Sequence, residues 1–371
     1  MPSAIAFLPW VAVDKPFALG PLRLLPYHQT KLPGDLAYTT QADIDGVLSA
    51  YANHPGNRIK KATILELGDW HTGMDAQDVA PAIFRARNAL AFAALSRRHL
   101  FREHLGYCNY DSYSLVLQRY SPGNAGTFTF STRRRDGGTN HLWSSNDFVF
   151  HRPNHVDPHC KVCFDEPLLA ALLAFQDSEA HLFEALTEFN SANTDSPDVP
   201  EHVEVVMMKS AFEWLLQIGE RANEFVDRLT FFLNDVASVE SYGPLEIEWQ
   251  KARPNAVRPI EAWAREFCDI RGASAHGKPR TAPRFVWTTH THLAFASLLF
   301  PLVFKKVAAK IGLLKLDHFD VERLKRIDAY VMHEPFKFDW RAPDATHPWV
   351  EIDSQAFCYA RTGDFYSENS V

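Results

Sequence analysis

The feature that most constrains this 371-residue chain is a long stretch of helical periodicity in its second half. From about Glu166 to Met332, apolar residues recur at every third or fourth position, with short breaks between the periodic segments. The pattern is clearest in Glu201–Gly219, whose apolar face comprises Val203, Val206, Met207, Ala211, Trp214, Leu215 and Ile218. Such a succession predicts several helices that bury their apolar faces against one another.

The residues ahead of this stretch are patterned for strands as well as helices. Two apolar runs punctuated by Pro and Gly, near Ala4–Val13 and Leu19–Pro26, are typical of strands joined by turns. Ser112–Arg119 alternates and is rich in Val, Leu and Tyr, and Thr127–Thr132 is similar, which predicts two further strands. A long helix is predicted from about Asp78 to His104, where an apolar stripe recurs in steps of three and four.

The chain is therefore predicted to be α+β, with its strands confined to the N-terminal part. We expect a mixed α/β domain over residues 1–163, an all-α helical bundle over 164–332 and a C-terminal extension over 333–371. Within the bundle, helices are predicted at about Glu166–Asn190, Glu201–Gly219, Arg221–Val236, Pro259–Ala275, Val286–Ile311 and Phe319–Met332. The irregular loops of the N-terminal domain favour a role as a sensor or specificity module.

Composition and motif content exclude several classes of protein. Hydrophobic residues make up 46% of the chain and charged residues 22%, which rules out a disordered or coiled-coil protein. The formal net charge of −7 provides no basic field over the whole chain, so any nucleic-acid contact must come from a local patch. P-loop, Rossmann and serine-hydrolase motifs are all absent from the sequence, so these chemistries lack their physical parts.

Several features favour a reduced, cytoplasmic protein. Met1–Trp10 lacks the basic start, apolar stretch and cleavage site of a signal peptide. The longest apolar run, Leu293–Val303, is about half of the roughly 20 residues that a bilayer requires, so no membrane span is expected. The five cysteines are an odd number scattered along the chain, which favours free thiols. Cys268 is a candidate nucleophile, yet a single Cys on an apolar helix is more often part of the core.

A group of His and Cys residues lies just before the predicted bundle. It comprises His151, His155, His159, Cys160 and Cys163. Imidazole and thiolate groups are the ligands that zinc prefers, and four of them could complete a tetrahedral site. However, no second pair completes a recognised zinc spacing, and a His-rich loop leading into the first helix explains the same residues. We therefore predict no metal and no other cofactor, and keep these five residues as metal candidates to be tested.

Arg271 and His276 stand at the end of a predicted helix. The spacing Arg-x4-His carries little information by itself, because Arg23 and His28 share it. The context is more specific, since the pair closes a helix inside an all-helical region and is followed by Gly277, a candidate C-cap.

Three segments in order extend this pattern over roughly a hundred residues. They are EALTEFNSAN (Glu184–Asn193), VVMMKSAFEWLL (Val205–Leu216) and FCDIRGASAHGK (Phe267–Lys278). Together they resemble the HEPN superfamily, specifically bacterial proteins with a long N-terminal region ahead of a HEPN domain. The resemblance implies a metal-independent endoribonuclease that acts on RNA as a homodimer. It also implies a regulated toxin or antiviral defence effector, with an unidentified regulatory or phage-derived partner.

In such an enzyme, Arg271 and His276 would be the catalytic residues. Cleavage of RNA by its 2′-hydroxyl needs a group of near-neutral pKa, and His276 can accept that proton. The charge that develops at phosphorus needs a cation, which the guanidinium of Arg271 supplies. Five positions along a helix amount to about 140° of rotation, so a two-fold dimer is expected to bring the residues together. Glu213 is expected to pair with Arg271 and orient it, and Lys278 and Arg280 to bind RNA.

One position departs from the family pattern. Active members usually carry Asn, Asp or His directly after the Arg, whereas this chain has Gly272. Ser274 is a candidate replacement for the missing polar group. The alternative function is therefore a non-catalytic HEPN domain that serves RNA binding, dimerisation or scaffolding in a larger assembly. A third interpretation is a purely structural Arg271 and a helix-ending His276.

Overall fold

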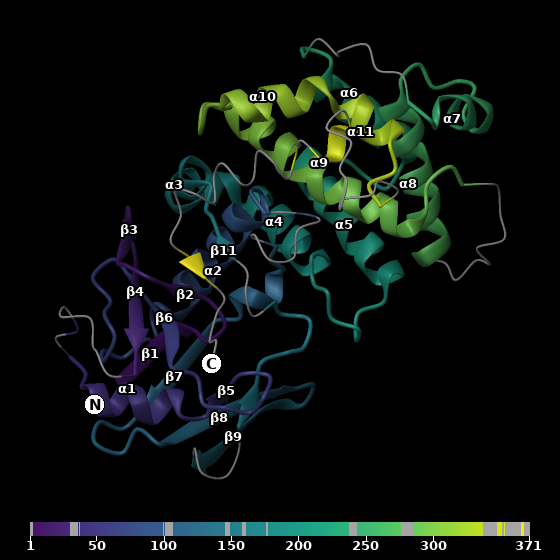
Figure 1. Cartoon of the computed structure of the whole chain (residues 1–371). Helices are drawn as coiled ribbons and strands as arrows, with labels where there is room; N and C mark the ends of the chain where they lie inside the picture. The colour runs from purple at the N-terminus through teal and green to yellow at the C-terminus, as the bar shows by residue number, and fades with distance from the viewer. Residues whose placement is uncertain are drawn as a thin grey trace. The chain divides into compact units, whose positions relative to one another are not determined.

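The computed structural model of this chain describes residues 3–29, 36, 38–98, 100, 107–144, 149–157, 161–175, 177–236, 243–275, 285–336, 347–350, 352 and 365–366. Their fold is α+β, as predicted, with an N-terminal sheet followed by helices (Figure 1). The chain forms two compact units. The sheet unit is Met1–Arg98, Arg102–Leu173 and Ala360–Val371, and the helical unit is His99–Phe101 and Ala174–Tyr359.

The sheet unit is built around a sheet of seven strands in the order β3-β4-β6-β1-β7-β8-β9, with antiparallel neighbours. Its strands are β1 (Ser3–Leu8), β3 (Phe17–Leu19), β4 (Leu22–His28), β6 (Lys61–Leu67), β7 (Val116–Tyr120), β8 (Thr127–Arg134) and β9 (Gly137–Ser144). In two smaller sheets, β10 lies beside β5, and β12 lies between β11 and β2. These strands are β2 (Ala12–Val13), β5 (Tyr51–Ala52), β10 (Phe150–His151), β11 (Lys161–Val162) and β12 (Phe365–Tyr366).

In the described part of the chain, the α-helices of the sheet unit are α1 (Gln41–Leu48), α2 (Ala80–Leu95) and α3 (Glu166–Ala174), whose last residue begins the helical unit.

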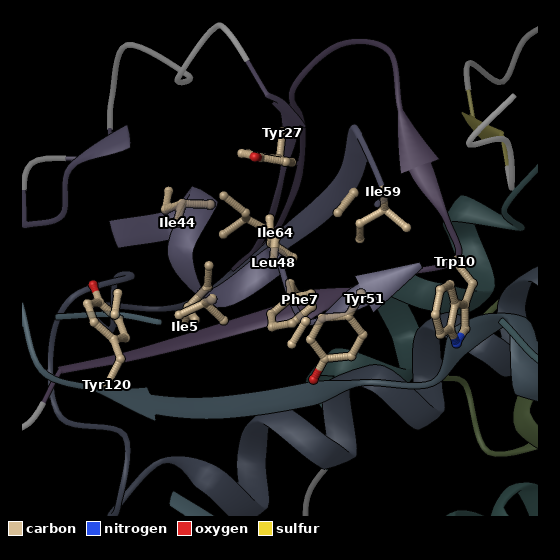
Figure 2. Close-up of a cluster of buried hydrophobic side chains, with 14 of the residues drawn as sticks. Ile5, Phe7, Trp10, Tyr27, Ile44, Leu48, Tyr51, Ile59, Ile64 and Tyr120 are labelled. Carbon is tan, nitrogen blue, oxygen red and sulfur yellow. The ribbon is translucent and has the colours of Figure 1, made fainter. Parts of the chain in front are cut away.

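One face of the large sheet carries a buried apolar core. Ile5 of β1, Ile64 of β6 and Leu48 of α1 belong to one buried cluster (Figure 2). In the same cluster the rings of Phe7 and Tyr51 meet edge to face, with centroids 5.1 Å apart. Every residue of β1 is buried because this strand lies in the interior of the sheet.

The helical unit is a bundle arranged around α9. Its helices in the described part of the chain are α4 (Ala180–Ala192), α5 (Glu201–Leu216), α6 (Ala222–Leu233), α7 (Glu246–Ala252), α8 (Pro259–Ala275), α9 (Thr289–Lys310), α10 (His318–Lys325) and α11 (Ile327–Met332). Helix α9 contacts α4, α5, α6, α8, α10 and α11. Helices α5 and α6 lie within Glu201–Gly219 and Arg221–Val236, the two segments for which the sequence predicts helices.

Aromatic rings from four helices form the core of this bundle. Phe300 of α9 stacks on Phe189 of α4, with ring centroids 4.6 Å apart, and meets Phe212 of α5 edge to face at 5.1 Å. Trp263 of α8 meets Phe295 of α9 edge to face at 4.7 Å. Because such pairs add orientation to apolar burial, they hold α8 in a defined position against α9.

Helix α9, with 22 residues, is the one helix in the described ranges that is long and apolar enough to cross a membrane, by length and composition. However, 83% of its most apolar stretch is buried inside the structure, as in the core helix of a bundle. The helix begins later than predicted because Thr288 caps it, its side chain accepting from the N–H of Thr291.

The first long helix is shorter than predicted. Instead of continuing to about His104, α2 ends at Leu95, and Ser96 caps its last turn. The following Arg97 forms a buried ion pair with Asp165, with 2.9 Å between Nε and Oδ2. The prediction was wrong because the partner of Arg97 lies far along the chain, where local periodicity gives no information about it.

Two segments predicted as single helices are each divided. Residues 166–190 contain α3 and α4, separated by a 3₁₀ turn at Asp177–Glu179. Residues 319–332 contain all of α10 except its first residue and the whole of α11, and the two helices meet at Arg326. In both segments the apolar spacing continues across the break, so the periodicity does not reveal it.

Several elements were not predicted, namely α1, α7, β6 and β9. Strand β6 is buried at five of its seven positions, so it lacks the alternation that marks a half-exposed strand. Strand β9 begins directly after a hairpin turn, at Gly137, whose φ of 120° favours glycine. Gly137 pairs with Arg134, so the hairpin turn is Arg135 and Asp136.

The unit boundary falls at Leu173, whereas the sequence placed it at residue 163, so α3 joins the sheet unit. The expected C-terminal extension, residues 333–371, is divided between the units. Trp349 is buried in the helical unit, where its Nε1–H donates to the carbonyls of Tyr330 and His333 at 3.0 and 2.8 Å. Strand β12, in contrast, pairs with β2 and β11 of the sheet unit.

Candidate functional site

The candidate site lies at the C-terminal end of α8, a helix that is anchored at its start and packed along its buried face. At its start, Asp328 of α11 accepts from the N–H of Ile260 at 3.2 Å and from the guanidinium of Arg258 at 2.8 Å. Further along, Phe267 and Ile270 are buried against the bundle. Arg271 follows at the edge of this buried face, which leaves its side chain 23% exposed.

Arg271 is only weakly engaged by the rest of the protein. Its Nη1 lies 3.7 Å from Oε2 of Glu220, whose side chain is 75% exposed. Its Nε is buried and has no hydrogen-bond partner within the described residues. An exposed pair of this length contributes little to stability, so the guanidinium keeps N–H donors for an anionic ligand.

Glu213 does not form the ion pair expected of it. Its Oε1 accepts from Nζ of Lys209 at 2.8 Å, and the two residues lie one turn apart on α5. The Lys209 side chain is almost wholly buried, and its Nζ lies 4.6 Å from the ring centroid of Phe225. A buried ammonium requires an anionic partner, so Glu213 neutralises Lys209 instead of orienting Arg271.

Cys268 lies beside these charges but is not poised to act as a nucleophile. Burial raises the pKa of its thiol to about 11, against the lowering effect of Lys209 and Arg271. The thiol therefore stays protonated near neutral pH, whereas nucleophilic cysteines react as thiolates. This agrees with the interpretation of Cys268 as a core residue.

Gly272 and Ser274 occupy the last turn of α8. A Cβ built on Gly272 would meet no atom within 4 Å, so the position faces open space beside Arg271. Ser274 is half-buried. A polar side chain at residue 272 would thus fit without steric conflict, and its absence is a matter of sequence alone.

His276, Lys278 and Arg280 lie outside the residues that the structure describes. The chain that follows them is fixed by Glu266 of α8. Its Oε2 accepts from the N–H of Val286 at 3.0 Å, and its Oε1 accepts from the N–H of Trp287 at 2.9 Å.

Glu266 and His292 were not identified from the sequence. Both are fully buried, with 3.2 Å between Glu266 Oε1 and His292 Nε2. Burial lowers the pKa of His292, and the hydrogen bond that its ring donates to Glu266 opposes this effect. A lone Glu on the apolar face of α8 was the signal that could have revealed the pair, since a buried carboxylate needs partners.

The described members of the His and Cys group ahead of the bundle, His151, His155 and Cys163, are not assembled into a ligand set. His151 is exposed at the end of β10, and the Nε2 of His155 lies 3.1 Å from Oδ2 of Asp111. Cys163 is half-buried, while His159 and Cys160 lie outside the described residues. Within the ranges that the structure describes, no group of three or more His, Cys, Asp or Glu could hold a metal ion.

In comparisons with protein families, curated proteins and solved structures, no match to this chain was found. The charges of Lys209 and Glu213 cancel, and Arg253 is paired with Asp269 at 2.5 Å. Arg271, in the part of this region that the structure describes, retains binding capacity for an anion.

Proposed function

We propose that this chain is a metal-independent endoribonuclease of the HEPN type, with His276 as general base and Arg271 as phosphate stabiliser. The observation that carries the proposal is the weak engagement of Arg271, whose nearest carboxylate is the exposed Glu220 at 3.7 Å. A partly exposed guanidinium whose one carboxylate contact among the described residues is 3.7 Å long suits an anionic transition state. Its expected setting is a regulated toxin or antiviral defence effector in the cytoplasm.

The proposed reaction is an internal transfer. His276 accepts the proton of a 2′-hydroxyl, and the 2′-oxygen forms a bond to the adjacent phosphorus. The bond from phosphorus to the 5′-oxygen breaks, and that oxygen takes up a proton. The products are a 2′,3′-cyclic phosphate and a 5′-hydroxyl, and Arg271 offsets the charge that develops on the phosphoryl oxygens.

The proposal includes a homodimer because the five positions between Arg271 and His276 in the sequence correspond to about 140° of rotation at helical spacing. Two copies related by a two-fold axis can present both residue types at one cleft. Sedimentation at micromolar concentration tests this point. A dimer is expected, and a chain that sediments as a monomer would remove the composite cleft.

The second candidate function is non-catalytic RNA binding, dimerisation or scaffolding. Gly272 favours it, because the position beside Arg271 has room for a side chain yet carries none. In this case Arg271 would bind RNA phosphates without cleavage.

Incubation of the full chain with total RNA in EDTA separates the two functions. The proposed ribonuclease cleaves RNA, and Arg271→Ala reduces cleavage by about 10²-fold or more. The matched control is Arg221→Ala, at a side chain 83% exposed, which is expected to leave cleavage unchanged. A wild-type chain that binds RNA without cleaving it would support the second candidate.

A further inference from the structure

Near the C-terminal end of α6, an exposed aromatic ring lies beside two cations. Phe231 is 52% exposed, and its buried neighbour Phe232 packs against it with ring centroids 5.4 Å apart. The Nζ of Lys310, at the end of α9, lies 4.0 Å from the ring centroid of Phe231. The Cζ of Arg228 lies 5.5 Å from the same centroid. We call Phe231, Arg228 and Lys310 the Phe231 patch.

Both cations of the Phe231 patch are exposed, and neither forms an ion pair with a carboxylate in the described part of the chain. Lys306, one turn earlier on α9, is by contrast paired with Asp235. The chain carries a formal net charge of −7, so two uncompensated cations at one apolar ring are unusual for its surface. This combination indicates a ligand with both an anionic part and a flat apolar part.

We propose that the Phe231 patch binds single-stranded RNA, with a base stacked on Phe231 and the neighbouring phosphates bound by Arg228 and Lys310. Aromatic side chains stack on bases of any sequence, and flanking cations follow the backbone. The ammonium of Lys310 now lies over the ring, and its exposed, flexible side chain can turn to a phosphate as the base takes its place. This exchange is favourable because base stacking is stronger than an exposed cation–π contact.

Helix α6 links the patch to the candidate site. Glu220, which lies 3.7 Å from Arg271, precedes the first residue of α6, and Phe231 lies near the other end of the helix. From Ala222 to Phe231 the helix rises by about 14 Å. RNA held at the patch can therefore extend toward Arg271. The inference rests on the proposed RNA substrate, to which it adds a binding site outside the catalytic residues.

The test is a binding titration of the full chain by fluorescence anisotropy. The probe is a labelled single-stranded 2′-O-methyl oligoribonucleotide, which cannot be cleaved because it has no free 2′-hydroxyl. Phe231→Ala is expected to weaken binding about 10-fold or more, and Phe231→Tyr to retain it. Combined Arg228→Ala and Lys310→Ala should reduce the slope of log K against log salt by about 1.4. Ile247→Ala, at an exposed apolar residue of α7, is the control and should not change binding.

Phe231→Leu keeps an apolar contact with Phe232 but removes the aromatic face. It is expected to melt at the wild-type temperature and still to bind the probe more weakly. Unchanged affinity of Phe231→Ala and Phe231→Leu for the probe would overturn the inference. Equal affinity for a duplex probe, or equally effective displacement by polyglutamate, would also overturn it. Binding that depends on Phe231 without cleavage of natural RNA would defeat the proposed ribonuclease and leave this site standing. Cleavage of natural RNA by Phe231→Ala at the wild-type rate would support the proposed ribonuclease and overturn this binding site.

Discussion

Lys209 and Arg271 are two cations of the helical unit whose charges serve different purposes. Lys209 is buried and paired with Glu213 at 2.8 Å, so its charge is committed to the fold. Arg271 is partly exposed and lies 3.7 Å from the exposed Glu220. The fold depends on the first pair, whereas the second leaves a guanidinium that can bind a ligand.

This contrast predicts a large loss of stability when the first pair is broken and almost none when Arg271 is removed. Glu213→Ala leaves the Lys209 ammonium buried without its partner, and we expect the free energy of unfolding to fall by about 2–4 kcal/mol. Arg271→Ala is expected to change it by less than about 1 kcal/mol. Urea unfolding measures both, with Glu220→Ala as a surface control. A large loss of stability in Arg271→Ala would show that Arg271 is structural and would contradict its proposed role.

Gly272 provides a second prediction at this scale. A methyl group there meets nothing within 4 Å, and glycine inside a helix costs about 0.5–1 kcal/mol relative to alanine. Gly272→Ala should therefore raise the free energy of unfolding by about that amount, measured by urea unfolding. Under the proposed function, Gly272→Asn, which supplies the polar residue that active HEPN proteins usually carry at this position, should raise the rate of RNA cleavage. A loss of stability in Gly272→Ala would mean that the position is not open.

At the scale of elements, the connection from α8 to α9 depends on one buried carboxylate. Glu266 accepts hydrogen bonds from the N–H groups of Val286 and Trp287 and lies 3.2 Å from His292. It thereby fixes the chain just after the segment that carries His276. Two partners of Glu266 are backbone N–H groups, which no sequence motif identifies, so the lone Glu on the apolar face of α8 is the signal that the sequence offers.

The buried His292 makes stability depend on pH. Burial lowers its pKa below the ordinary value of 6.5, so the unfolded chain binds a proton that the folded chain does not. Stability should therefore fall as the pH drops below about 6.5, with a slope of up to about 1.4 kcal/mol per pH unit. His292→Gln keeps a donor for Glu266 without titrating and should reduce this slope in urea unfolding. His290→Gln, at an exposed residue, should leave the slope unchanged. Equal slopes in wild type and His292→Gln would show that His292 is not the source of the pH dependence.

At the scale of the whole molecule, the α+β class and the helical second half follow from hydrophobic periodicity, because amphipathic helices show it most strongly. The bounds of α8 are those predicted, since Pro259 suits the first turn of a helix. The breaks between α3 and α4, and between α10 and α11, were missed because the apolar spacing continues across them. Strand β6 was missed because both of its faces are buried.

The candidate site was only partly predictable for a related reason. Arg271 is placed at the end of α8, as its position in the motif indicates. The pairing of Glu213 was predicted wrongly, although Lys209 lies four residues earlier on the same helix, a spacing that allows contact. Whether Glu213 meets Lys209 or Arg271 depends on burial, which only the packed bundle determines.

The most direct test of the central claim is the cleavage rate of His276→Ala in EDTA. Single-turnover cleavage of a labelled single-stranded RNA is compared between wild type, His276→Ala and the surface control His290→Ala. Loss of a positioned general base reduces a rate by about 10²–10⁴-fold, so His276→Ala should fall by this factor while His290→Ala matches the wild type. Undiminished cleavage by a folded His276→Ala chain would contradict the assignment of ribonuclease chemistry to this site.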